Sequence, residues 1–196
     1  VSVVDRRDPF SANHSLRVGA VSAAIANEMG LDPVDLETAE IAGRLMNLGK
    51  IGVPTEVLTK RDKLTDEEVK MIRDSIETSA DLIHDTEFDG PVENTLRQLQ
   101  ERFDGRGMPN GLRGDDILVT ARVVSVANAF VGMVSARSWR PGMSFDKAMD
   151  ILRGDVGKAF DRRVVSALEN YLDNEGGREE WRTYGMPPKE PQAQLL

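Results

Sequence analysis

The sequence predicts an all-α fold, a helical bundle of about seven helices around one core. Apolar residues recur at helical spacing in several segments, and no stretch of convincing length alternates apolar and polar residues as a strand would. The 196 residues are enough for one compact domain. We therefore expect one helical domain over residues 1–175, followed by a polar, Pro-rich and poorly ordered tail over residues 176–196, with Trp181 and Tyr184 as its only anchors.

Three helices are predicted in the first half of the chain, over residues 14–29, from Asp32-Pro33 to about residue 49, and from residue 65 onward. Gly30 is a stop signal for the first helix. The third begins with Thr65 and Glu68, which have the spacing of a capping box.

Four more helices are predicted over about residues 92–103, 120–136, 144–153 and 161–172. Ser144 and Asp161 are the expected N-caps of the last two. The segment FDGRGMPNGLRGDDI, residues 103–117, lies between the first two of these helices and holds four Gly, one Pro and one Asn. No helix or central strand accommodates that composition, so we expect a loop.

Composition excludes several classes of partner and location. The net charge of −8, from 33 acidic against 25 basic residues, repels nucleic acid and anionic lipid surfaces. The chain has no cysteine, which excludes a disulfide framework and a thiolate metal site. It also lacks an apolar run that could cross a bilayer and a signal-peptide core, so we expect a cytoplasmic protein. Because the chain begins at Val1 with a turn signal close behind, we expect an upstream sensor or receiver domain that is absent from it.

Four segments together resemble successive blocks of the HD-GYP domain. They are DPFSANHSLRV (8–18), MNLGKIGVPTEVLTKRDKLTDEE (46–68), ERFDGRGMPNGLRGDDI (101–117) and ARVVSVANAFVGMVSARSWR (121–140), in the family's order, and the resemblance covers about residues 8–172. It implies a helical bundle in which histidines and aspartates hold two or three metal ions, usually iron or manganese. Those ions activate water to hydrolyse cyclic di-GMP, a bacterial second messenger.

Most ligand positions implied by the resemblance carry residues that bind such ions poorly. The His-Asp pair that names the family is Met46-Asn47 here, so a thioether and a neutral amide replace an imidazole and a carboxylate. Only His14 and Asp74 keep a metal-ligating side chain, and Asp74 also fits a solvated surface residue. The family's ligand positions fall on His14, Met46, Asn47, Asp74, Leu99, Gln100 and Asn128.

This pattern predicts a chain without a metal or other cofactor, whose former ligand cavity has been repacked as core. His14 is then a hydrogen-bonded residue at a helix start, and the second histidine, His84, matches no family ligand. We therefore expect a catalytically inactive domain that acts as a protein-interaction or output module in bacterial signal transduction. The resemblance names diguanylate cyclase domains among the partners of such a module.

Two alternatives remain open. One is a metal-free receptor that binds cyclic di-GMP or another nucleotide through Lys50, Arg137 and Arg140 without cleaving it. The two arginines could instead pair with nearby acids such as Asp104 or Asp146. The other alternative is an active phosphodiesterase with an unorthodox metal site.

The glycine-rich loop is the expected partner-binding element, because the resemblance ties this loop to partner recognition. Its residues are Asp104, Gly105, Arg106, Gly107, Met108 and Pro109, with Met in place of the family's Tyr. Met108 or Phe103 could serve as an apolar anchor, although Phe103 could equally close the core beneath the loop. A homodimer is the default oligomer, through a patch expected from Leu82, Ile83, Phe88 and Trp181.

Overall fold

The computed structural model describes residues 13–60, 62–136 and 141–186, and it confirms the all-α class. No strand occurs within these ranges, and only two isolated β-bridges interrupt the loops. None of the helices there is both long and apolar enough to span a membrane. In chain order the helices are α2 (His14–Glu28), α3 (Pro33–Leu45), the 3-10 helix η2 (Leu48–Gly52), α4 (Thr55–Leu58), α5 (Asp66–Asp81), α6 (Val92–Arg97), the 3-10 helix η3 (Gly114–Asp116), α7 (Val119–Val134), α8 (Phe145–Gly154), α9 (Arg162–Asn174) and α10 (Gly177–Glu180).

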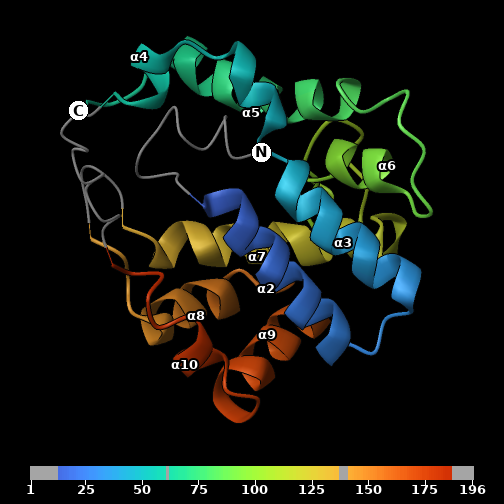
Figure 1. The fold of residues 1–196 in the computed structure, drawn as a ribbon, viewed down its shortest axis with the longest axis vertical. Coiled ribbons are helices and arrows are strands. Elements are labelled where there is room, and N and C mark those ends of the chain that lie inside the picture. The colour runs from blue at the N-terminus through green and yellow to red at the C-terminus, as the bar shows by residue number, and fades with distance from the viewer. Residues whose placement is uncertain (1–12, 61, 137–140, 187–196) are drawn as a thin grey trace, which may run out of the picture.

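Helix α7 is the centre of the bundle. Its sequence VTARVVSVANAFVGMV is apolar on almost every face, which is typical of a helix surrounded by protein. It packs against α2, α3, α6, α8 and α9, and Figure 1 shows α2 and α3 crossing in front of it with α8 and α9 below. Ten of its residues are buried. The side chains of α7 therefore form a large part of the core.

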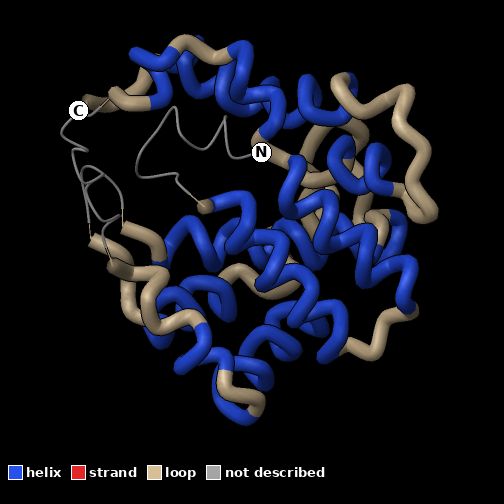
Figure 2. The backbone as a smooth tube through the Cα atoms, viewed as in Figure 1, coloured by secondary structure: helices blue, strands red, loops and turns tan. Residues whose placement is uncertain are grey.

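Helix α5 forms a separate polar layer over the turn that follows α3, at the top of Figures 1 and 2. The predicted capping box at its start is present in full: Thr65 accepts from the backbone N–H of Glu68, and the Glu68 side chain accepts from that of Thr65. Gly49 lets η2 approach α5 closely, because a Cβ there would lie 2.0 Å from the carbonyl oxygen of Ser75. The Ser79 hydroxyl fixes this contact by accepting from Gly49 N and donating to Met46 O.

Several predicted boundaries are confirmed, whereas two helices end earlier than predicted. Helix α3 ends at Leu45 instead of about residue 49. Ser144 and Asp161 cap α8 and α9 as expected. The helix predicted over residues 92–103 ends at Arg97, because the next residues bond to distant segments. The Gln98 side chain accepts from Leu118 N, and Phe103 N donates to Ala159 O. Tertiary contacts thus end α6 earlier than its sequence pattern does. The helices η2, η3, α4 and α10 were not predicted.

Residues 176–186 are folded onto the bundle, whereas composition predicts poor order from residue 176. Trp181 is 1% exposed and lies among three aromatic rings, with centroid distances of 5.1 Å to Tyr171 and 6.0 Å to both Phe130 and Tyr184. Such a buried indole contributes several kcal/mol, roughly 3–5, to folding. Trp181 is therefore unavailable for the expected dimer patch, as is Ile83, which is 6% exposed.

Candidate functional site

Three of the seven ligand positions come together where α2, the α3–η2 turn and α7 meet. His14 is the first residue of α2, and its Nε2 lies 3.0 Å from Oδ1 of Asn128 on α7. Asn47 lies in the turn between α3 and η2, and its Nδ2 donates to the Ser15 hydroxyl at 3.2 Å. These two contacts tie the three segments together. We call His14, Ser15, Asn47 and Asn128 the His14 cluster.

The two hydrogen bonds that define the His14 cluster join an imidazole to an amide and an amide to a hydroxyl. Because an amide oxygen can only accept, Nε2 of His14 carries the hydrogen in its contact with Asn128. A protonated ring nitrogen has no lone pair for a metal, so ligation through this atom requires the contact to break. His14 is 6% exposed and Asn47 is 6% exposed, which keeps bulk water away from both contacts.

The other family positions lie outside this cluster or carry no hard donor. Met46 is 3% exposed and belongs to the apolar core, as does Leu99. Gln100 donates from Nε2 to the carbonyl oxygen of Arg73 at 3.0 Å. The Asp74 side chain lies on the exposed side of α5 and pairs with Lys70 at 2.5 Å.

A groove of about 400 Å³ lies between η2 and α5. Gly49 and Gly52 form one wall, and Lys70, Asp74 and Ser75 belong to the other. Lys50, which is half-buried, lies in η2 between these two glycines. Lys50 is the only expected phosphate-binding residue that the structure describes, and it is not among the residues that line the groove. Arg137 and Arg140 lie outside the described residues.

The described residues do not fit the two or three metal ions that the resemblance implies. Nowhere within the described ranges do three or more His, Cys, Asp or Glu side chains gather as a group that could hold a metal ion. A dinuclear site needs about three to four protein ligands per ion. Here the donors at the family positions are a histidine already bonded to an amide and an aspartate already paired with a lysine. No step of a reaction can be written through such a centre from these residues.

The glycine-rich loop is tightly held, and the residue that holds it was missed in the sequence. Glu101 is 5% exposed, and its carboxylate accepts from Asn110 N at 2.7 Å and from Leu112 N at 3.0 Å. Gly107 packs directly on the backbone, since a Cβ there would lie 2.3 Å from Arg102 N. The sequence signal for this role was an acidic residue directly before the glycine-rich segment, because a carboxylate can accept hydrogen bonds from several backbone N–H groups.

The structure also describes the surroundings of Met108, Phe103, Asp104 and Asp146, whereas pairing of these acids with Arg137 or Arg140 stays untested. Met108 is 46% exposed at its tip, whereas Phe103 is half-buried beside a small internal cavity. Asp104 pairs with Arg102, whose hydrogen bond holds the pKa of the Asp104 carboxyl below its usual value. Asp146 pairs with Arg178. Partner binding through this loop stays a prediction.

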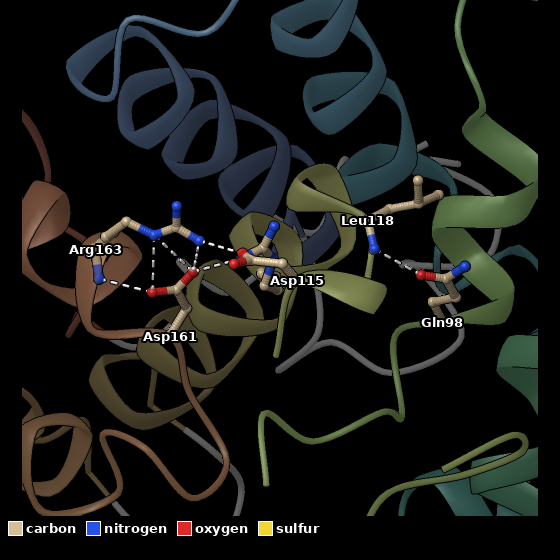
Figure 3. A network of polar contacts seen from close by, with 6 residues as sticks. Gln98, Asp115, Leu118, Asp161 and Arg163 are labelled. Atoms are coloured by element: carbon tan, nitrogen blue, oxygen red, sulfur yellow. Dashed lines mark hydrogen bonds and ion pairs between the residues drawn. The ribbon is translucent and has the colours of Figure 1, made fainter. Parts of the chain in front are cut away.

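A second polar network, shown in Figure 3, joins η3, α7 and α9. Arg122 on α7 donates from Nη1 to Asp161 at 2.7 Å and to Asp115 at 2.6 Å. Arg163 donates from Nη2 to the same two carboxylates, at 3.0 Å and 2.5 Å. Arg122 is 9% exposed and Asp161 is 3% exposed. The sequence identified Asp161 only as a helix cap, because its partner Arg122 is 39 residues away and its other partner, Arg163, lies on the helix that it caps.

The family model for the HD domain matches residues 2–164 of this chain. The chain belongs to the HD domain family. A solved HDG"Y"P protein of Bdellovibrio bacteriovorus is 26% identical, covers 82% of this chain and 52% of that one, and superposes with a TM-score of 0.66. The solved cyclic GMP-AMP-specific phosphodiesterase of Vibrio cholerae shares the fold, with a TM-score of 0.63 at 16% identity, over 90% of this chain and 49% of that one. The expected HD-GYP resemblance is confirmed.

Curated relatives match most of this HD domain and less than half of their own length. The cyclic di-GMP phosphodiesterase response regulator RpfG of Xanthomonas campestris is 32% identical over 84% of this chain and 44% of that protein. The cyclic di-GMP phosphodiesterase of Thermotoga maritima is 30% identical over 83% of this chain and 45% of that protein. The 3′3′-cGAMP-specific phosphodiesterase 3 of Vibrio cholerae is 28% identical over 87% of this chain and 37% of that protein.

These relatives contradict the expectation of a catalytically inactive output module that is not an enzyme. They are named as phosphodiesterases, and they match this HD domain over most of its length. The expectation counted donors only at positions that the family pattern marks. Replacement at those positions describes the ligand set, and it does not by itself show that hydrolysis has been lost.

Proposed function

We propose that this HD domain is a phosphodiesterase domain of cyclic dinucleotide signalling, with a substrate of the 3′,3′-linked class such as cyclic di-GMP or 3′3′-cGAMP. The observation that carries the proposal is the match to proteins named for these two activities over 83–87% of the chain. The solved relative with the higher TM-score of the two is an HDG"Y"P protein, which supports the same assignment.

An anionic dinucleotide needs local positive charge on a chain whose net charge is −8. Lys50 in η2 would supply part of it, because it matches the family's lysine position after the His-Asp pair. We propose Lys50 together with Arg137 and Arg140 as the phosphate-binding set. An ammonium and two guanidinium groups can together bind both phosphates of a cyclic dinucleotide.

The residues at the family's ligand positions determine what the test of this proposal must measure. In the family a bound metal would supply an activated water and neutralise charge on the phosphate. The described residues do not provide the donors for that centre, so both the hydrolysis and its metal dependence have to be measured. Elemental analysis of the same preparation shows which metal, if any, accompanies the activity.

The deciding experiment incubates the purified chain with cyclic di-GMP and, separately, with 3′3′-cGAMP. Each reaction is run with Mn²⁺, with Fe²⁺ under anaerobic conditions, and with EDTA, and the linear dinucleotide is separated by chromatography. The expected result is linear product well above the no-protein reaction in at least one metal condition. Equal product without protein in every condition would overturn the proposal.

Matched variants guard against a contaminating hydrolase. His14→Ala removes the one histidine that the chain shares with the family's ligand positions, and His84→Ala removes the exposed one. Both variants are purified in parallel with the parent chain. We expect His14→Ala to lower the rate and His84→Ala to leave it unchanged. Equal rates in all three preparations would assign the activity to a contaminant.

A further inference from the structure

Arg17 joins three parts of the molecule that are distant in sequence. It lies on α2, and its Nη1 donates to the Ser135 hydroxyl at 3.1 Å and to the carbonyl oxygen of Tyr184 at 2.9 Å. Its guanidinium carbon also lies 4.6 Å from the centroid of the Tyr184 ring. The residue thus connects α2, the end of α7 and the segment 176–186.

The contact between Arg17 and the Tyr184 ring is a cation–π contact rather than an ion pair. Burial raises the pKa of Tyr184 to about 12, so its phenol is neutral at physiological pH. Burial also lowers the pKa of Arg17, yet a guanidinium stays protonated in proteins. The quadrupole of the ring attracts the guanidinium, and partial desolvation of the cation strengthens that attraction. The contact is therefore strong enough to fix where the guanidinium sits.

The segment 176–186 is anchored without help from Arg17. Trp181 is buried among aromatic rings, as described above. Arg178 pairs with Asp146 on α8 and with Asp173 on α9, each at 2.8 Å. The Tyr171 hydroxyl donates to Glu180 at 2.7 Å. The segment 176–186 is thus held in place by its own contacts, and Arg17 packs against it.

The first turn of α2 needs such an external contact, because its own cap is weak. Its N-cap residue Asn13 has a φ of 65° and makes no side-chain capping hydrogen bond. Asp32, by contrast, caps α3 by accepting from Asp35 N at 2.9 Å. An uncapped helix start leaves backbone donors without intrahelical partners and frays easily. Tertiary contacts must then hold the first turn of α2.

Arg17 connects the same two helices that the His14 cluster connects. It lies three residues after His14, within one helical turn. Its partner Ser135 is the C-cap of α7, the helix that carries Asn128. A movement of the first turn of α2 away from the end of α7 would therefore lengthen the contact between His14 and Asn128.

We propose that Arg17 is a positioning residue, through which the docked segment 176–186 sets the contact between His14 and Asn128. Its consequence for hydrolysis rests on the function proposed above, whereas its effect on His14 does not. A misplacement of about 1 Å at a reacting group lowers the rate about 10–100-fold. Under the proposal, Arg17 acts on kcat more than on KM, because its described contacts lead to the His14 cluster.

The chain offers a direct readout, since it contains only two histidines. His14 is buried, and the side chain of His84 is 68% exposed and pairs with Glu93. Imidazole ¹H–¹⁵N spectra of uniformly labelled protein therefore contain one reporter of the cluster and one internal control. The variant is Arg17→Met, which keeps much of the aliphatic stem and removes the donors. The matched control is Arg153→Met, which removes an arginine paired with Asp150 and Glu169 on an exposed face.

The expected result is a shift and broadening of the His14 signals in Arg17→Met, with the His84 signals unchanged and both sets unchanged in Arg153→Met. A folded Arg17→Met protein with His14 signals identical to those of the parent chain would overturn the proposal. If Arg17→Met does not fold, Ser135→Ala removes the hydroxyl that accepts from Arg17 and Tyr184→Leu removes the ring beneath its guanidinium, and the same spectra decide. These spectra are informative even if the parent chain proves to hydrolyse nothing, so failure of the two proposals can be told apart.

Discussion

Helix α7 carries two buried polar sites, one built on an ion pair and the other on a hydrogen bond between an imidazole and an amide. Near its start, Arg122 is almost fully buried and meets the buried carboxylate of Asp161 at 2.7 Å. Near its middle, Asn128 meets the buried imidazole of His14, and neither side chain is a carboxylate or a guanidinium. At the first site, the charges of Arg122 and Asp161 compensate each other. The second lies where the family resemblance implies carboxylates neutralised by metal ions.

The difference follows from the cost of burying charge. An isolated buried ion costs several kcal/mol, and only a well-placed opposite charge or a metal offsets that cost. Amide and imidazole groups need only a hydrogen-bond partner. The His14 cluster can therefore stay folded without an ion, whereas the Arg122 network depends on its acids. The predictions below test this contrast, beginning with the largest expected effect.

Breaking the charged site should have the largest effect. Asp161→Ala removes the buried carboxylate that pairs with Arg122 and also the N-cap of α9. Leaving a buried charge uncompensated costs about 3–5 kcal/mol. Urea denaturation of the variant should show a loss of this size in the free energy of unfolding. The control is Asp150→Ala, which removes an exposed partner of Arg153 and should cost about 0–1 kcal/mol. Similar losses in both variants would mean that burial does not distinguish the two pairs.

Rebuilding hard donors at the second site should make it respond to metal. The variant Met46→His, Asn47→Asp, Asn128→Asp restores an imidazole and two carboxylates at family ligand positions, and both carboxylates fall within the His14 cluster. At about 100 times the dissociation constant, Mn²⁺ would add about 2.7 kcal/mol to stability. That corresponds to a rise of roughly 5–11 °C in the melting temperature. Scanning calorimetry with Mn²⁺ and with EDTA measures it, and the parent chain should respond less. An equal rise in the parent chain would show that it already has a competent site.

Removing one partner of the neutral pair should have a moderate effect. Asn128→Ala deprives the ring N–H of His14 of its acceptor, which costs about 1–2 kcal/mol. This lies below the expected loss for Asp161→Ala, because no net charge is left unpaired. Denaturation curves of Asn128→Ala and of the exposed control Asn174→Ala give the comparison. A loss for Asn128→Ala as large as that for Asp161→Ala would contradict the neutral description of the His14 cluster.

The smallest effect should be a change in acid stability. Hydrogen bonds from Arg122 and then Arg163 hold the pKa of Asp115 below its usual value. Its folded pKa therefore lies below its unfolded pKa, so the stabilisation is present above about pH 4 and is lost as the pH falls through the folded value. Asp115→Asn should flatten the acid limb of a stability-against-pH curve and leave the His14 signals in place. An unchanged acid limb would show that the exposed arm of the network contributes nothing.

Local signals predicted the parts of the fold that depend on neighbours in sequence. The Thr65–Glu68 capping box, the caps Ser144 and Asp161, and the apolar run of α7 all form as expected, because each involves residues within one or two helical turns. The early end of α6 was not predicted, because the Gln98 side chain accepts from a backbone N–H 20 residues away. The burial of Trp181 was missed for the same reason, since its ring partners Phe130 and Tyr171 lie on other helices.

By itself, the sequence determined the helical class, the order of the helices, the HD-GYP resemblance and the replacement of most ligand positions. Composition and local hydrogen bonding are enough for these, because they depend on residue type and short spacing. Only the tertiary structure decided that His14 meets Asn128 across 114 residues, and that Arg17 reaches Tyr184 across 167. Such contacts depend on how the helices cross, and the packing of the whole core sets that geometry rather than any one segment.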